Sequence, residues 1–177
     1  VYFIDNEDYF QRKHTYRDAK GNEFPDNDER AIFFARGVLE TVIKLRWAPD
    51  LIHCHGWLTS LVPLYIKKAY HDDPLFENSK VVYSVYHDDF KNTLDATFRT
   101  KLQMNNIEED DTELVDDPTY INLSKLAIQF SDAVIQGSPK VNSEITEFIQ
   151  TSEKLFLDYQ PEHTYIDTYN DLYDKLL

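Results

Sequence analysis

The segment that determines the fold reads Pro49-Asp50-Leu51-Ile52-His53-Cys54-His55-Gly56-Trp57. Residues 51–54 form a short, mostly apolar run that is typical of a buried strand. His55-Gly56 then turns the chain into a predicted helix from about Thr59 to Tyr70, with Pro63 in its first part. A strand, a turn and a helix in this order are the repeating unit of an α/β protein with a parallel sheet.

The same alternation continues along the chain. The clearest strand is 80–86, which is rich in β-branched and aromatic residues and ends at His87-Asp88-Asp89. A helix is predicted over 121–130, a strand over 132–135 and a helix over 139–149. We therefore expect a mostly parallel sheet whose ligands bind outside the carboxyl ends of its strands.

The segments outside this alternation are less regular. Val1 to Ile4 predicts a strand, and Asp26 with Glu29 three residues later predicts a capping box at the start of a helix that stops before Pro49. The charged loop 108–117 is expected to be a solvated loop or lid. We expect one domain over 1–152, lacking its first segment, and an aromatic helical tail over 153–177 that packs on it.

Composition and charge narrow the class of protein. The 177 residues suit one domain, and 42% hydrophobic residues support a packed core. The formal charge of -14 would repel phosphate backbones and anionic lipids, so neither nucleic acid nor membrane is expected as a partner. A single cysteine, Cys54, permits no internal disulfide and fits a reducing, cytoplasmic location.

Two imidazoles separated by one residue are the first candidate site. His53 and His55 would face the same side of a strand, and with Asp88 or Asp89 they could hold a metal ion. A two-histidine pattern alone is a weak signal, so we expect no metal. His53 more simply faces the core or a neighbouring helix with one nitrogen bonded to the backbone.

The ends of two strands carry the second candidate site. His55 and His87 occupy matching places after neighbouring strands, where they could hydrogen-bond a polyhydroxylated substrate or a developing negative charge, or could simply be surface histidines. Gly56 permits close approach of a ligand, and Trp57 could stack on a sugar or anchor the core. The sequence has no Gly-rich phosphate loop and no serine-hydrolase elbow, which argues against nucleotide hydrolysis and against serine-hydrolase chemistry.

Several segments taken together resemble the N-terminal, starch synthase catalytic domain of bacterial glycogen synthases and plant starch synthases, glycosyltransferase family 5. The resemblance covers residues 5–145. It is carried by Asp5-Asn6, Tyr9-Phe10 with Arg12, Pro25-Asp26-Asn27 with Arg30, the segment 49–57, Val85-Tyr86-His87, Ile121-Asn122-Leu123-Ser124-Lys125, Ser138-Pro139 and Glu144-Ile145.

This resemblance implies a Rossmann-like three-layer domain that forms the N-terminal half of a GT-B glycosyltransferase. It also implies a hexosyltransferase that moves glucose from ADP-glucose to an α-1,4-glucan and needs no cofactor. By the same resemblance, Asp26 would lie near the transferred sugar, His55 would contact it or stabilise the transition state, and Asn122 would line the cleft. His87, Trp57 and Gly56 would be the remaining substrate-binding residues.

The chain departs from the family pattern at two places. The family has His-Asp-Trp followed by His or Gln, whereas this chain has His55-Gly56-Trp57-Leu58, and the family has His-Asn where this chain has His87-Asp88. Residues 1–177 contain neither the lysine-and-glycine motif that opens the family domain nor the C-terminal domain expected to bind the donor. The chain is therefore expected to be incomplete alone, completed by a partner domain or a homo-oligomer, or else to be a non-catalytic glucan-binding or regulatory relative.

Overall fold

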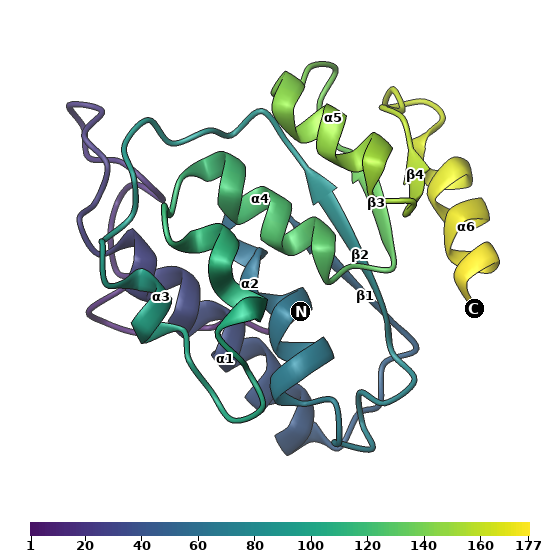
Figure 1. Ribbon diagram of the computed structural model, residues 1–177, viewed down its shortest axis with the longest axis horizontal. Helices are drawn as coiled ribbons and strands as arrows, with labels where there is room; N and C mark the ends of the chain where they lie inside the picture. Colours follow the sequence, from purple (N-terminus) through teal and green to yellow (C-terminus); the bar gives the residue numbers. More distant parts are fainter.

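The computed structural model describes residues 1–177, which form one four-stranded parallel sheet. The strands are β1 (Leu51–His55), β2 (Lys80–Val85), β3 (Ala133–Gln136) and β4 (Leu155–Leu157), and they lie side by side in chain order. Cys54 pairs with Tyr83 and Tyr83 pairs with Val134 across the first three strands. All four carboxyl ends therefore meet at one edge of the sheet (Figure 1).

Helical segments lie before β1, between consecutive strands and after β4, and those between β1, β2 and β3 agree with the sequence prediction. The segments are α1 (Asn27–Leu45), η1 (Trp57–Thr59), α2 (Leu61–Leu64), η2 (Tyr65–Ala69), α3 (Phe98–Lys101), η3 (Asp110–Val115), α4 (Tyr120–Gln129), α5 (Ser143–Thr151) and α6 (Tyr165–Leu176). The single helix predicted over 59–70 is divided into a 3₁₀ turn, an α-helical turn around Pro63 and a π-helical turn.

The sheet separates two apolar clusters, which gives the molecule three layers. The larger cluster packs α1, α2, α4 and α5 against one face, where Cys54, Tyr83 and Val134 are buried. The smaller cluster packs Leu172 of α6 against Val82, Ala133 and Ile135 on the other face. Figure 1 shows α6 beside β4, at the yellow end of the chain. Residues 153–177 thus supply both a helix and a strand, β4, which the sequence analysis did not predict.

Two local predictions are wrong. Val1 to Ile4 is not a strand, because no strand of the sheet pairs with it and the side chain of Phe3 is exposed. Asp26 precedes α1 but its side chain makes no capping hydrogen bond, and Glu29 accepts one from the Tyr9 hydroxyl instead.

Within the acidic loop, η3 forms a short 3₁₀ helix, and Asp111 pairs with Lys68 at 2.7 Å. None of the helices is both long and apolar enough to cross a membrane.

Candidate functional site

A cavity of about 610 Å³ lies at the carboxyl end of β2. Its wall is formed by residues 14–18 on one side and by His87, Asp88, Asp89 and Lys91 on the other. The sequence predicted a ligand site at this edge of the sheet, and His87 is the one predicted site residue in the wall. The His87 side chain is 71% exposed, so its ring is accessible to a ligand, and its Nδ1 atom lies 3.4 Å from Oδ1 of Asp89.

Asp88 is a half-buried acidic group in this wall. Its Oδ1 atom accepts a hydrogen bond from the Tyr120 hydroxyl at 3.0 Å, and its Oδ2 atom lies 3.4 Å from the backbone nitrogen of Trp57. Burial raises the pKa of the Asp88 carboxyl, whereas the hydrogen bonds from Tyr120 and Trp57 act in the opposite direction. The carboxylate therefore joins the ends of β1 and β2 to the start of α4.

His55 lies at the end of β1 but is not in the wall of this cavity. Its Nδ1 atom is 2.8 Å from the Tyr86 hydroxyl, and its ring stacks on His53 with centroids 3.9 Å apart. Partial burial beside His53 and Tyr86 lowers the pKa of His55, so its imidazole is neutral at neutral pH. A neutral imidazole has one donor and one acceptor, which suits a sugar hydroxyl.

His53 faces the same side of β1 as His55, as the strand geometry predicts. The prediction that one of its nitrogens bonds the backbone is wrong. Nδ1 lies 2.7 Å from the Tyr173 hydroxyl of α6, and Nε2 lies 2.7 Å from the Ser84 hydroxyl of β2. Burial, followed by the charge of His55, lowers the pKa of His53 to about 3. No group of three or more His, Cys, Asp or Glu side chains could hold a metal ion, so the metal hypothesis lacks a ligand set.

Trp57 is an anchor of the core rather than a sugar platform. Its side chain is 1% exposed and lies between Tyr16, at a centroid distance of 4.9 Å, and Phe90, at 5.2 Å. Gly56 comes directly before it with a φ of +72°, a backbone conformation that side chains rarely adopt. The glycine thus turns the chain sharply between β1 and η1.

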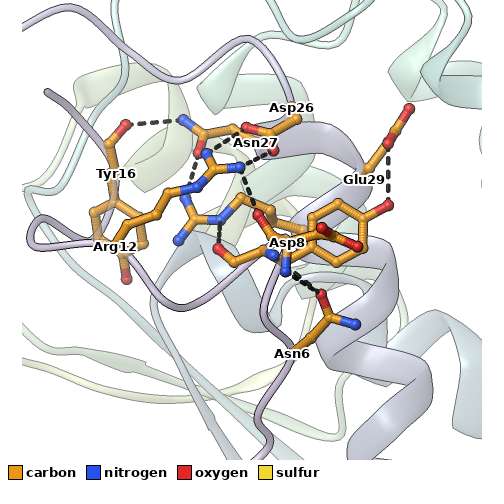
Figure 2. Close-up of polar contacts among 9 residues, drawn as sticks. Asn6, Asp8, Arg12, Tyr16, Asp26, Asn27 and Glu29 are labelled. Atoms are coloured by element: carbon orange, nitrogen blue, oxygen red, sulfur yellow. Dashed lines mark hydrogen bonds and ion pairs between the residues drawn. The ribbon is translucent and has the colours of Figure 1, made fainter.

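Asp26 is held by an arginine near the start of α1. Arg12 binds both carboxylate oxygens, with Nη1 2.8 Å from Oδ1, and Figure 2 shows the two side chains facing one another. Hydrogen bonding by Arg12 lowers the pKa of the Asp26 carboxyl. This pairing explains why Asp26 does not cap the helix. Asp26 is absent from the wall of the 610 Å³ cavity.

Asn122 lies in the first turn of α4, where its side-chain amide donates to the Asp117 carbonyl at 2.9 Å. It too lies outside the wall of the cavity. The structure thus separates the predicted site residues into three places: His87 at the cavity, His55 beside Tyr86, and Asp26 and Asn122 at helix starts.

Sequence reasoning missed Tyr120, which is the first residue of α4, and residues 14–18, which lie in a polar loop without a motif. Tyr86 carries a signal that could have been used, since it follows the clearest strand directly. Its hydroxyl reaches His55, and its ring lies against Gly137 at the end of β3.

A parallel sheet covered by helices, with a polar cavity at the carboxyl ends of its strands, defines a Rossmann-like ligand-binding domain. The family described as the starch synthase catalytic domain matches residues 1–156, and the chain belongs to that family. The fold is that of the N-terminal half of a GT-B glycosyltransferase, as the sequence predicts.

Curated relatives agree with this assignment. The chain is 45% identical over 88 residues to a glycogen synthase of Chlorobium luteolum, covering 49% of this chain and 18% of the relative. It is 33% identical over 147 residues to glycogen synthase 2 of Geobacter metallireducens, covering 82% of this chain and 30% of the relative. The chain therefore spans less than a third of the length of these relatives.

A solved structure shares the fold. The catalytic domain of starch synthase IV from Arabidopsis thaliana, bound to ADP and acarbose, superposes with a TM-score of 0.63 over 85% of this chain and 31% of that chain. The two sequences are 19% identical, so this likeness concerns the fold alone.

Proposed function

We propose that this chain is the acceptor-side part of a glycogen or starch synthase, which transfers glucose from ADP-glucose to an α-1,4-glucan. The observation that carries the proposal is the family match over residues 1–156 together with the polar cavity at the carboxyl edge of the sheet. The starch synthase of similar fold was solved with ADP and acarbose, a nucleotide and a sugar-like ligand. Sugar nucleotide and α-glucan are therefore the proposed ligands.

The polar groups at the carboxyl edge suit a sugar. His55 and His87 offer exposed imidazoles, and Asp88 offers a carboxylate held by Tyr120 and Trp57. Groups of this kind, fixed before the ligand arrives, orient hydroxyls and stabilise charge that develops in a transition state. Donor contacts from a second domain or a second chain would complete the site, so weak transfer is expected from this chain alone.

A second function has a specific observation in its favour. Gly56 and Asp88 replace an acidic and an amide residue of the family motifs, and Asp26 is bound by Arg12 rather than free. A non-catalytic glucan-binding or regulatory relative of glycogen synthase would tolerate all three features.

One experiment separates these two functions. The purified chain is incubated with radiolabelled ADP-glucose and glycogen, alone and with a complete bacterial glycogen synthase, and a glycogen pull-down is run on the same preparation. Incorporation above background that falls in His55→Ala and His87→Ala supports a transferase. Binding without incorporation supports the glucan-binding function, and loss of both overturns the glucan proposal. Lys44→Ala, an exposed change in the last turn of α1 and outside the cavity wall, is the control.

A further inference from the structure

Gly56 and Asp88 compete for one volume at the carboxyl edge of the sheet. A Cβ atom placed on Gly56 would lie 2.7 Å from Oδ2 of Asp88 and 3.8 Å from its Cγ. Real Cβ atoms essentially never approach an oxygen this closely, so one of the two groups would have to move. The Asp88 carboxylate thus fills the space that a side chain at position 56 would occupy.

The carboxylate is not free to leave that space. The Tyr120 hydroxyl bonds Oδ1 at 3.0 Å and lies 2.5 Å from the Tyr86 carbonyl, and Oδ2 faces the Trp57 nitrogen. These partners come from α4, from the end of β2 and from η1. Moving the carboxylate would leave the buried Trp57 N–H without its acceptor, at a cost of about 1–3 kcal/mol, whereas the Tyr120 hydroxyl would keep the Tyr86 carbonyl.

The turn that carries Gly56 also carries His55, and the segment that carries Asp88 also carries His87. The Gly56 nitrogen donates to the Ser84 carbonyl of β2 at 3.0 Å, so the two strand ends are joined by backbone as well. A shift of the Asp88 side chain would therefore change the distance between the two histidines and the shape of the cavity wall that Asp88 lines.

We propose that Asp88 is a positioning residue for the sugar site. The lack of a side chain at Gly56 leaves the room that the Asp88 carboxylate occupies. The carboxylate at position 88 holds the β1–η1 turn against the end of β2 and so sets the placement of His55 and His87. Two of the three positions at which the chain departs from its family motifs, Gly56 and Asp88, are thus one compensated change rather than two losses. The proposal rests on the proposed function only for the identity of the ligand.

A stability cycle tests the geometry without any ligand. Gly56→Ala is introduced into the wild type, into Asp88→Asn, which keeps the volume of the side chain, and into Asp88→Ala, which removes it. The strain of the positive φ is common to all three backgrounds and cancels. We expect the melting temperature to fall by roughly 5 °C more when Gly56→Ala is made in the wild type or in Asp88→Asn than when it is made in Asp88→Ala, where only the strain of the positive φ remains.

Equal losses in all three backgrounds would overturn the proposal. If Gly56→Ala does not fold, the expected result is that Gly56→Ala with Asp88→Ala folds whereas Gly56→Ala with Asp88→Asn does not. Asp18→Ala is the matched control, since it removes a carboxylate from the same cavity wall without approaching Gly56. Gly56→Ala should lower the melting temperature of the Asp18→Ala variant by as much as it lowers that of the wild type.

Two further measurements separate positioning from simple packing. Imidazole resonances of His55 and His87 should shift in Asp88→Ala and return close to their wild-type values in Asp88→Asn. Binding of maltoheptaose by calorimetry should weaken about tenfold in Asp88→Ala and recover in Asp88→Asn. Unshifted resonances in a folded Asp88→Ala would contradict the positioning role, whereas a wild type that binds no maltoheptaose while the stability cycle holds would contradict only the proposed function.

Discussion

The Nδ1 atom of His53 lies 2.7 Å from the hydroxyl oxygen of Tyr173, a residue 120 positions further along the chain. This hydrogen bond joins β1, an edge strand of the sheet, to α6 near the end of the sequence. Apart from it, α6 is held by the small apolar cluster around Leu172. The histidine and the tyrosine thus form the main polar link between the helix and the sheet.

Removing that hydroxyl tests how firmly α6 is held. Tyr173→Phe should lower the free energy of unfolding by about 1–2 kcal/mol, since one nitrogen of the half-buried His53 loses its partner. The measurement is urea unfolding followed by circular dichroism. Tyr165→Phe is the control, because Tyr165 lies on the same helix, is 40% exposed and makes no hydrogen bond through its hydroxyl. Equal losses in the two variants would contradict the role of this hydrogen bond.

His53 also predicts a dependence of stability on pH. Its pKa in the folded protein is about 3, against an ordinary value of 6.5, because burial disfavours the charged ring. The unfolded chain therefore binds a proton at His53 below pH 6.5 while the folded chain does not, so stability falls as the pH falls from about 6.5 toward 3. The slope from this group is at most about 1.4 kcal/mol per pH unit.

Comparison with a variant isolates this group from the carboxylates. His53→Gln cannot titrate, so its unfolding free energy should fall less steeply than that of the wild type between pH 6.5 and 4. Parallel curves for the two proteins would show that His53 takes up its proton equally in both states.

Gly137 leaves room for the ring that reaches His55. A Cβ atom at position 137 would lie 2.5 Å from Cε1 of Tyr86. Gly137→Ala should therefore displace the ring, break its hydrogen bond to His55 and cost about 1–3 kcal/mol of stability. Thermal unfolding measures the loss, and a Tyr86→Ala background should remove most of it.

Gly37→Ala is the matched change in helix α1. Its Cβ would meet only Ile4 at 3.3 Å, and alanine favours a helix over glycine by about 1 kcal/mol. This variant should be as stable as the wild type or more so. A similar loss at both glycines would argue against the close packing of Tyr86.

The elements that the sequence predicted correctly are those with local signals. The β-branched run 80–86 and the periodic apolar residues of α1 and α4 carry enough apolar surface to define a strand and two helices. Strand β4 has three residues and little pattern, so it was missed. Val1 to Ile4 has a strand composition, but a strand also needs a neighbour in register.

The candidate site could be placed from the sequence only at the level of the sheet edge. Its details depend on partners distant in the chain: Tyr173 for His53, Arg12 for Asp26, and Tyr120 for Asp88. Side-chain partners of this kind leave no periodic pattern. The capping box at Asp26 shows the difficulty, because the local motif is present but a stronger charged partner takes the carboxylate.

The two tryptophans provide a direct test of the core. Trp57 is 1% exposed, whereas Trp47 is 58% exposed beyond the end of α1. Trp57→Ala should cost about 3–5 kcal/mol of unfolding free energy and Trp47→Ala about 0.5 kcal/mol or less. Denaturant unfolding measures both. A small loss at Trp57, with glucan binding reduced, would instead support the stacking role that the sequence left open.

The ion pair between Arg12 and Asp26 gives the final prediction. Both side chains are about one quarter exposed, and the arginine binds both carboxylate oxygens. We expect Arg12→Ala and Asp26→Asn each to destabilise the protein, and the double variant to lose about 1 kcal/mol less than the sum of the two. Arg12→Lys keeps the charge but not the two-pronged geometry, so it should recover only part of the loss.

The same pair predicts an effect of acid. Hydrogen bonding by Arg12 lowers the pKa of the Asp26 carboxyl in the folded protein, so the stability it provides is present above the ordinary carboxyl pKa and is lost as the pH falls through the lowered value. Urea unfolding at several pH values, with the exposed change Lys13→Ala as control, measures both effects. Two results together would contradict this structural role: additive losses of unfolding free energy for the Arg12 and Asp26 variants at neutral pH, and glucan binding that falls only in the Asp26 variant. Asp26 would then belong to the sugar site that the family resemblance implies.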